Sequence, residues 1–111
     1  MAGTVSDLTV VVGLARSGIG AAKLLHQAGR AVLVIDNQQG PDLEARAADL
    51  RQLGIAVQLG APLHPDTFAA LANPPVAVVV SPGIRWDHPT LAWLRQQGRL
   101  PVVLEPLGAG G

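Results

Sequence analysis

The chain has 111 residues, of which 49% are hydrophobic and 14% charged, and its eight basic and eight acidic side chains cancel to a formal net charge of zero. This composition excludes intrinsic disorder and leaves no positive field that would attract nucleic acid or an anionic membrane surface. The lack of cysteine excludes disulfides, thiolate metal sites and a cysteine nucleophile, and it favours the reducing environment of the cytoplasm.

Five short apolar runs rich in β-branched residues predict strands at positions 8–12, 31–35, 55–57, 76–80 and 101–104. Each run is nearly continuous rather than alternating, which is typical of strands buried on both faces of a parallel sheet. None reaches the ~18 apolar residues that a membrane span needs. No basic region precedes a hydrophobic stretch at the N-terminus, as a secretory signal requires.

Segments with a helical spacing of apolar residues lie between these runs. The residues expected on the buried helix faces are Ala21, Leu24, Leu25 and Ala28 in the first segment, Leu43, Ala47, Leu50 and Leu53 in the second, Phe68 and Leu71 in the third, and Leu91 and Leu94 in the fourth. The resulting order, βαβαβαβαβ, predicts an α/β fold with a Rossmann-like, doubly wound parallel sheet of about five strands and four helices. We expect residues 1–107 to form one domain and the glycine-rich residues 108–111 to be a tail or a point of truncation.

The first predicted strand leads directly into a glycine-rich loop of sequence Gly-Leu-Ala-Arg-Ser-Gly, and a helix follows. In such a loop the first glycine allows a sharp turn, a small third residue lets a pyrophosphate approach the backbone, and the last glycine lets helix and strand pack closely. The amides at the start of the helix then attract an anion. The residues predicted to meet phosphate are Gly13, Ala15, Arg16, Ser17 and Gly18. The alternative is that the loop is a turn without a ligand. The place of the loop between a strand and a helix favours phosphate binding.

Asp36 and Asn37 follow the second predicted strand, about 20 residues beyond the glycine loop. A carboxylate at this place accepts a hydrogen bond from a ribose hydroxyl or another donor of a bound nucleotide, and an asparagine suits the edge of a base. These two residues could also simply start a turn. No basic residue stands beside Asp36 to receive a 2′-phosphate, which disfavours NADP.

The fourth predicted strand is followed by Ser81, Pro82 and Gly83. Proline keeps the preceding serine extended and glycine permits a tight turn. A serine hydroxyl and a glycine amide are thereby expected at the same edge of the sheet as the glycine loop. Alone, this segment would be read as a turn chosen for its geometry.

Together, the glycine loop, the Asp-Asn pair and the stretch Ser-Pro-Gly-Ile-x-x-Asp-His-Pro at 81–89 resemble the N-terminal domain of the Mur ligases, most closely the branch that adds D-glutamate. The resemblance covers residues 7–105 and departs from the family pattern at Ala15, where the family prefers glycine, and after the fifth strand. It implies that this domain holds UDP-N-acetylmuramoyl-L-alanine.

The resemblance also implies a role for each part of the predicted site. Arg16 and Ser17 would meet the diphosphate, Asp36 and Asn37 the uracil, and residues 81–83 the nucleotide-sugar opposite the loop. The parent enzyme would be an ATP-dependent, Mg²⁺-requiring ligase of peptidoglycan synthesis. We expect the family's central ATP-binding domain and its C-terminal domain to be absent from this chain, and the central one would be its partner.

The chain itself has no Gly-x-x-x-x-Gly-Lys-Ser/Thr loop, so we expect it to bind substrate without turning it over and without a cofactor of its own. The three histidines match no metal-ligand spacing, and we expect no metal site and no catalytic residue. An NAD-binding domain of a dehydrogenase or an NAD sensor remains an alternative, because the glycine loop and Asp36 would serve it equally well. A third possibility is a regulatory domain that keeps the fold without a ligand.

Overall fold

The computed structural model describes residues 8–14, 16–71, 75–80, 88–98 and 100–103. Within these residues the chain alternates between strand and helix through nine elements, in the predicted order. The strands are β1 (Thr9–Val12), β2 (Val32–Asp36), β3 (Ala56–Leu59), β4 (Ala77–Val80) and β5 (Leu100–Val103). The helices are α1 (Arg16–Gln27), α2 (Pro41–Gln52), α3 (Pro65–Ala69) and α4 (Pro89–Gln96).

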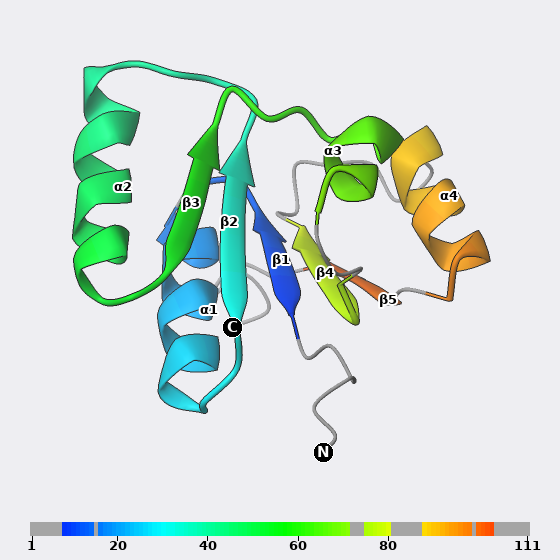
Figure 1. Cartoon of the computed structure of the whole chain (residues 1–111), viewed down its shortest axis with the longest axis horizontal. Coiled ribbons are helices and arrows are strands. Elements are labelled where there is room, and N and C mark those ends of the chain that lie inside the picture. Colours follow the sequence, from blue (N-terminus) through cyan, green and yellow to red (C-terminus); the bar gives the residue numbers. More distant parts are fainter. Residues whose placement is uncertain (1–7, 15, 72–74, 81–87, 99, 104–111) are drawn as a thin grey trace, which may run out of the picture.

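All five strands are parallel and lie in the order β3-β2-β1-β4-β5 (Figure 1). The chain first builds the sheet outward from β1 through β2 to β3 and then returns to the other side of β1 with β4 and β5. This arrangement confirms the predicted doubly wound α/β sheet. The strand order reverses between β1 and β4, and open sheets of this kind bind ligands at the carboxyl ends of the strands beside such a reversal.

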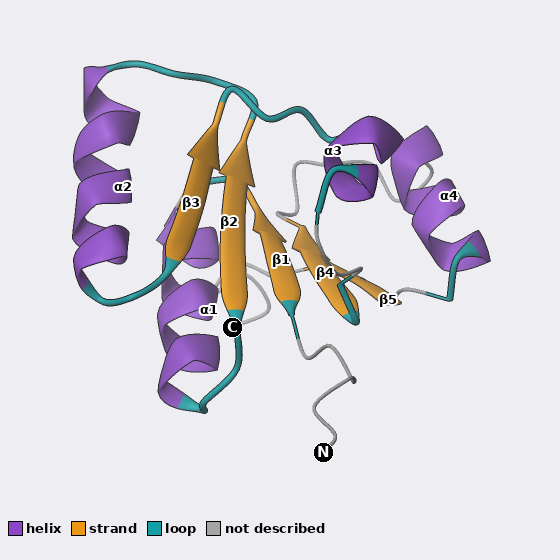
Figure 2. Ribbon diagram, viewed as in Figure 1, coloured by secondary structure: helices purple, strands orange, loops and turns teal. Residues whose placement is uncertain are grey.

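Two hydrophobic clusters cover the two faces of the sheet (Figure 2). One joins inward residues of α1 and α2 to alternate residues of the central strands, including Val11 and Val34, which are fully buried. The other joins α3 and α4 to the intervening residues, including Val10 and Val78. Because successive strand residues point to opposite faces, a nearly continuous apolar run is what a strand covered on both sides requires.

The predicted buried face of the first helix is partly wrong. Leu24 is 70% exposed, whereas Ala22, which lies outside the predicted stripe, is fully buried against the sheet. The reason lies at the start of α1, where Gly18 packs against Val11 of β1. This contact turns the helix face that carries residues 18, 22 and 25 toward the sheet. Leu24, two positions beyond Ala22, then lies on the opposite side of the helix and points away from the sheet. In α2 the predicted Ala47 and Leu50 are buried, but Leu53, just past the helix, is 49% exposed.

Candidate functional site

The glycine loop leaves β1 next to the end of β2. Gly13 has a φ of 106°, a conformation that side chains rarely tolerate, and its amide donates to the carbonyl of Ile35 at 2.7 Å. The chain therefore turns sharply at the end of β1 while one more hydrogen bond to β2 is kept. This is the role that the sequence predicts for the first glycine of the loop.

Gly18 lies in the first turn of α1 and is buried. A β-carbon at this position would clash with the carbonyl oxygen of Gly13 and would lie 3.5 Å from Cγ1 of Val11. The close approach of helix and strand therefore depends on a glycine, as predicted. It also puts the start of α1, whose first amides have no partner inside the helix, directly behind the loop.

Leu14, between these two glycines, is held by two charged side chains from other elements. Its amide donates to Oδ2 of Asp36 at 3.0 Å, and its carbonyl accepts from Nη1 of Arg46 at 2.7 Å. Oδ1 of Asp36 accepts from the amide of Gln38 at 2.9 Å, so both carboxylate oxygens bind main-chain amides. Each oxygen keeps a second lone pair, and Asp36 is only partly buried, so the carboxylate can still accept a donor from a ligand.

The predicted site residues fall into three groups. Gly13, Gly18, Asp36 and the exposed Asn37 lie together at the carboxyl ends of β1 and β2. For Arg16 and Ser17 only the main chain is described, at the start of α1. Ala15, Ser81, Pro82 and Gly83 lie outside the described residues.

The last described residue of β4 nevertheless fixes where the fourth strand ends. Val80 pairs with Val12, the last residue of β1. The carboxyl ends of β2, β1 and β4 therefore lie side by side, because Val12 is also in register with Ile35 of β2. The structure thus brings the end of β4 to the edge of the sheet that carries the glycine loop.

Arg46 is the residue at this edge that sequence reasoning missed. It lies on α2, one position before the buried Ala47, and its side chain is exposed. An arginine beside a buried helix stripe is a common surface residue, since its long stem covers apolar neighbours. No spacing rule points from it to a carbonyl 32 positions away.

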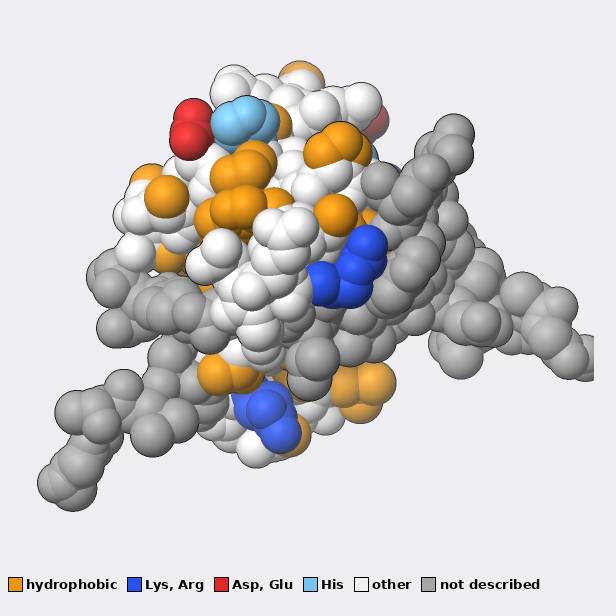
Figure 3. All heavy atoms as spheres, turned by 90° about the vertical axis from the view of Figure 1, so that its right-hand side faces the viewer, with side chains coloured by type: hydrophobic (Ala, Val, Ile, Leu, Met, Phe, Trp, Pro, Cys, Tyr) orange, Lys and Arg blue, Asp and Glu red, His pale blue; other side chains and the backbone are white. Residues whose placement is uncertain are grey.

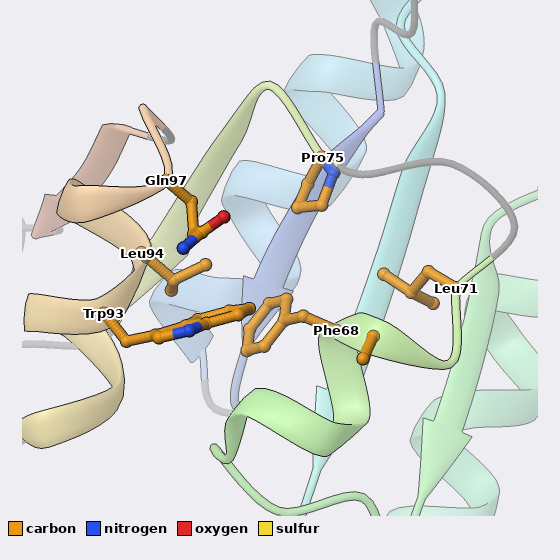
Figure 4. Close-up of a pocket in the computed structure, with 7 residues that line it drawn as sticks. Phe68, Leu71, Pro75, Trp93, Leu94 and Gln97 are labelled. Atoms are coloured by element: carbon orange, nitrogen blue, oxygen red, sulfur yellow. The ribbon is translucent and has the colours of Figure 1, made fainter.

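Residues of α3 and α4, the two helices on the side of the molecule that Figure 3 turns to the viewer, line a separate hollow of about 230 Å³. Phe68 and Trp93 lie side by side in its lining, with ring centres 6.5 Å apart, and Pro75 and Gln97 also line it (Figure 4). Pro75 precedes β4 and Gln97 follows α4, so the hollow lies toward the amino ends of the strands. It is not part of the edge that carries the glycine loop.

Two histidines have structural roles at helix starts. Nδ1 of His64 accepts from the amide of Asp66, and Nδ1 of His88 accepts from the amide of Thr90, each at 3.1 Å. Within the described part of the chain, no three His, Asp or Glu side chains gather in a way that could hold a metal ion. In the same residues, no helix combines the length and apolar character that crossing a membrane requires.

Comparison with known proteins adds independent information about this fold. Residues 7–103 match the family model described as Mur ligase MurD-like, N-terminal domain. Over 90 residues the chain is 58% identical to a UDP-N-acetylmuramoylalanine--D-glutamate ligase of Prochlorococcus marinus (strain MIT 9313), a match that covers 81% of the chain and 20% of the relative. Over 95 residues it is 50% identical to the ligase of the same name from Synechococcus sp. (strain JA-2-3B'a(2-13)), covering 86% of the chain and 18% of the relative.

A solved structure is also similar. The crystal structure of the UDP-N-acetylmuramate-alanine ligase MurC from Thermotoga maritima matches with a TM-score of 0.56 and 26% identity, over 86% of this chain and 20% of that one. The chain thus spans about a fifth of the length of the relatives that it matches.

Proposed function

This chain belongs to the Mur ligase family as a MurD-like N-terminal domain, and we propose on that basis that it binds UDP-N-acetylmuramoyl-L-alanine for a ligase that adds D-glutamate. The observation that carries the proposal is the match over residues 7–103 together with the glycine loop at the strand reversal. The names of the curated relatives support the choice of substrate and amino acid.

In this proposal the ligand lies across the carboxyl ends of β1, β2 and β4. The loop and the start of α1 receive the diphosphate, with Arg16 and Ser17 as its predicted side-chain contacts. A helix start favours an anion by about 0.3–1 kcal/mol at an exposed site, through its unpaired amides and its dipole. Asp36 and Asn37 receive the uracil, and the segment that begins at Ser81 lies along the nucleotide-sugar.

The chemistry of ligation belongs to the rest of the parent enzyme. Amide formation driven by ATP needs a phosphate-binding loop with a lysine and ligands for Mg²⁺. Lys23, the only lysine of this chain, lies within α1 rather than in a glycine-rich turn. We therefore assign ATP, Mg²⁺ and the reacting centre to other domains of a cytoplasmic enzyme of peptidoglycan synthesis, and to this chain the placing of the substrate.

Calorimetric titration of the chain with UDP-N-acetylmuramoyl-L-alanine, UDP and NAD tests the proposal. We expect heat with the two uridine nucleotides and none with NAD. Heat with NAD alone would instead identify a dinucleotide-binding domain, and no heat with any of the three would identify a domain that keeps the fold without this ligand.

A matched pair of variants locates the binding. Asp36→Asn removes the carboxylate at the loop, whereas Asp49→Asn removes one from the exposed side of α2. We expect the first to weaken UDP binding about tenfold, since hydrogen bonds to a charged group contribute about 1.5–3 kcal/mol. The second should leave the affinity unchanged. Equal affinities for both variants would remove Asp36 from the site.

A further inference from the structure

Side chains from two other elements hold the main chain of the glycine loop at Leu14, next to the main-chain bond from Gly13 to β2. The amide and the carbonyl of Leu14 belong to two consecutive peptide groups, and each is bound by a charged side chain, Asp36 from β2 and Arg46 from α2. Hydrogen bonds with one charged partner are shorter and stronger than neutral ones. The bond from Arg46, at 2.7 Å, is the shorter of the two.

This restraint lies next to a glycine, whose backbone torsion angles are limited least by its own side chain. Gly13, immediately before Leu14, adopts a φ of 106°, and a glycine has access to more backbone conformations than any other residue. A loop that must order when its ligand arrives loses conformational entropy at that moment, which weakens binding. A side chain that holds the loop in one conformation beforehand removes part of that cost.

The guanidinium of Arg46 binds the loop, and no carboxylate among the described residues competes for it. Among the described residues it forms no ion pair, whereas Arg51 on the same helix lies 4.0 Å from a carboxylate oxygen of Glu44. Arg51 likewise donates to a main-chain carbonyl, that of Val57 at 2.9 Å, but on β3 and away from the loop. The two arginines therefore make the same kind of bond, and only one of them makes it to the loop.

We propose that Arg46 is a positioning residue that fixes the Leu14 carbonyl, and with it the conformation of the glycine loop, for the diphosphate of the nucleotide. As far as it concerns the ligand, this inference rests on the proposed function. Arg46 acts through the main chain of Leu14, so it is expected to matter more for a ligand that carries the diphosphate than for one that lacks it.

The test compares Arg46→Met with Arg51→Met, which each remove one charge and one bond to a carbonyl from α2. Affinities for UDP and for uridine are measured by calorimetry. The Leu14 carbonyl-carbon shift and the amide exchange rate of Leu14 are measured by NMR without ligand. We expect Arg46→Met to weaken UDP binding about tenfold, to weaken uridine binding less and to alter both Leu14 signals. Arg51→Met should stay within about twofold for both ligands.

Arg46→Lys, which keeps the charge and one compact donor, should recover part of the lost UDP affinity. The inference is overturned if Arg46→Met and Arg51→Met weaken UDP binding alike, or if Arg46→Met leaves the Leu14 signals as in the wild type. Should Arg46→Met fail to fold in a urea titration, Arg46→Gln replaces it with the same expected direction. If the wild-type chain binds neither nucleotide, the proposed function fails, and the Leu14 signals alone decide whether Arg46 positions the loop.

Discussion

Gly13 and Gly18 are required for different physical reasons. Gly13 has a backbone conformation that side chains rarely adopt, whereas Gly18 has an ordinary helical backbone but no room for a β-carbon. A third glycine of the same segment, Gly20, lies in α1, and a β-carbon there would have no neighbour within 4 Å. Comparing the three glycines therefore distinguishes the need for an unusual backbone conformation from the need for room beside the α-carbon.

Replacing Gly18 by alanine should lower the free energy of unfolding by about 1–3 kcal/mol, because the added methyl group pushes α1 away from the Gly13 carbonyl and Val11. Chemical denaturation with urea measures this change. The affinity for UDP should fall as well, since the start of the helix moves with respect to the loop.

Gly20→Ala is the matched control for this prediction. Its methyl group meets no neighbour, and alanine restricts the unfolded chain, so stability should rise by about 0.5–1 kcal/mol. If both alanine variants were stabilised alike, the packing argument at Gly18 would be wrong.

The residues of the candidate site differ in how far the sequence alone could predict them. Gly13, Gly18 and Asp36 stand at positions defined by the strand, the turn and the helix that follows, so a local pattern suffices to find them. Arg46 could not be found in this way. Its partner is a main-chain carbonyl, which has no signature in the sequence, and the two meet only after α2 has packed on the sheet.

At the scale of elements, α3 and α4 begin in the same manner. Each has a histidine at the N-cap, with Nδ1 bound to the amide two residues later, and a proline at the first helical position. Proline fits there because the first amides of a helix have no intrahelical partner and its φ is already helical. Thr90 adds a link between the two segments, since its hydroxyl donates to the carbonyl of Leu63 at 2.9 Å.

Replacing His88 by alanine should cost about 1 kcal/mol of stability, because the amide of Thr90 loses its acceptor in a partly buried place. His88→Asn, which offers a side-chain oxygen at the same position, should recover most of the loss. Urea denaturation of the two variants measures the difference. Equal stability of the alanine and asparagine variants would mean that the imidazole contributes by packing rather than as a cap.

The order and type of the elements could be predicted from the sequence, but their faces and ends only in part. Predicted strand 31–35 is Val32–Asp36 in the structure, and predicted strand 101–104 is Leu100–Val103. Such shifts of one residue arise because pairing with neighbouring strands, not local composition, decides where a strand ends. The exposure of Leu24 has a similar origin, since the contact of Gly18 with β1 sets the rotation of α1 about its axis.

At the scale of the whole molecule, the glycine loop lies at the carboxyl ends of the strands and the hollow between α3 and α4 lies toward their amino ends. The two also adjoin different hydrophobic clusters. Leu14 belongs to the cluster of α1 and α2, whereas Phe68 and Trp93 belong to or pack against the other. Close-packed strands separate the two, so we expect a ligand at the loop to leave the α3–α4 contact unchanged.

Tryptophan fluorescence tests this separation. Trp86→Phe leaves Trp93 as the only tryptophan, since the chain has two. Titration of this variant with UDP should leave the emission of Trp93 constant while the NMR signals of Leu14 shift. A Phe68→Leu change in the same background provides the control, because the loss of the ring 6.5 Å away should alter the emission. A change in emission that follows UDP binding would show that the glycine loop and the α3–α4 contact are coupled.

The pairing of Val12 with Val80 has a consequence for a chain emerging from a ribosome. The glycine loop and its neighbours on β2 and α2 are synthesised early, but β4, which forms the other side of the strand reversal, is made only after three helices and three strands. Contacts between residues so distant in sequence are the slowest to form. On the proposal that uridine nucleotides lie across β1, β2 and β4, we expect a nascent polypeptide to retain them only after its sheet has closed around β1. Nucleotide retention would then be a late marker of its maturation.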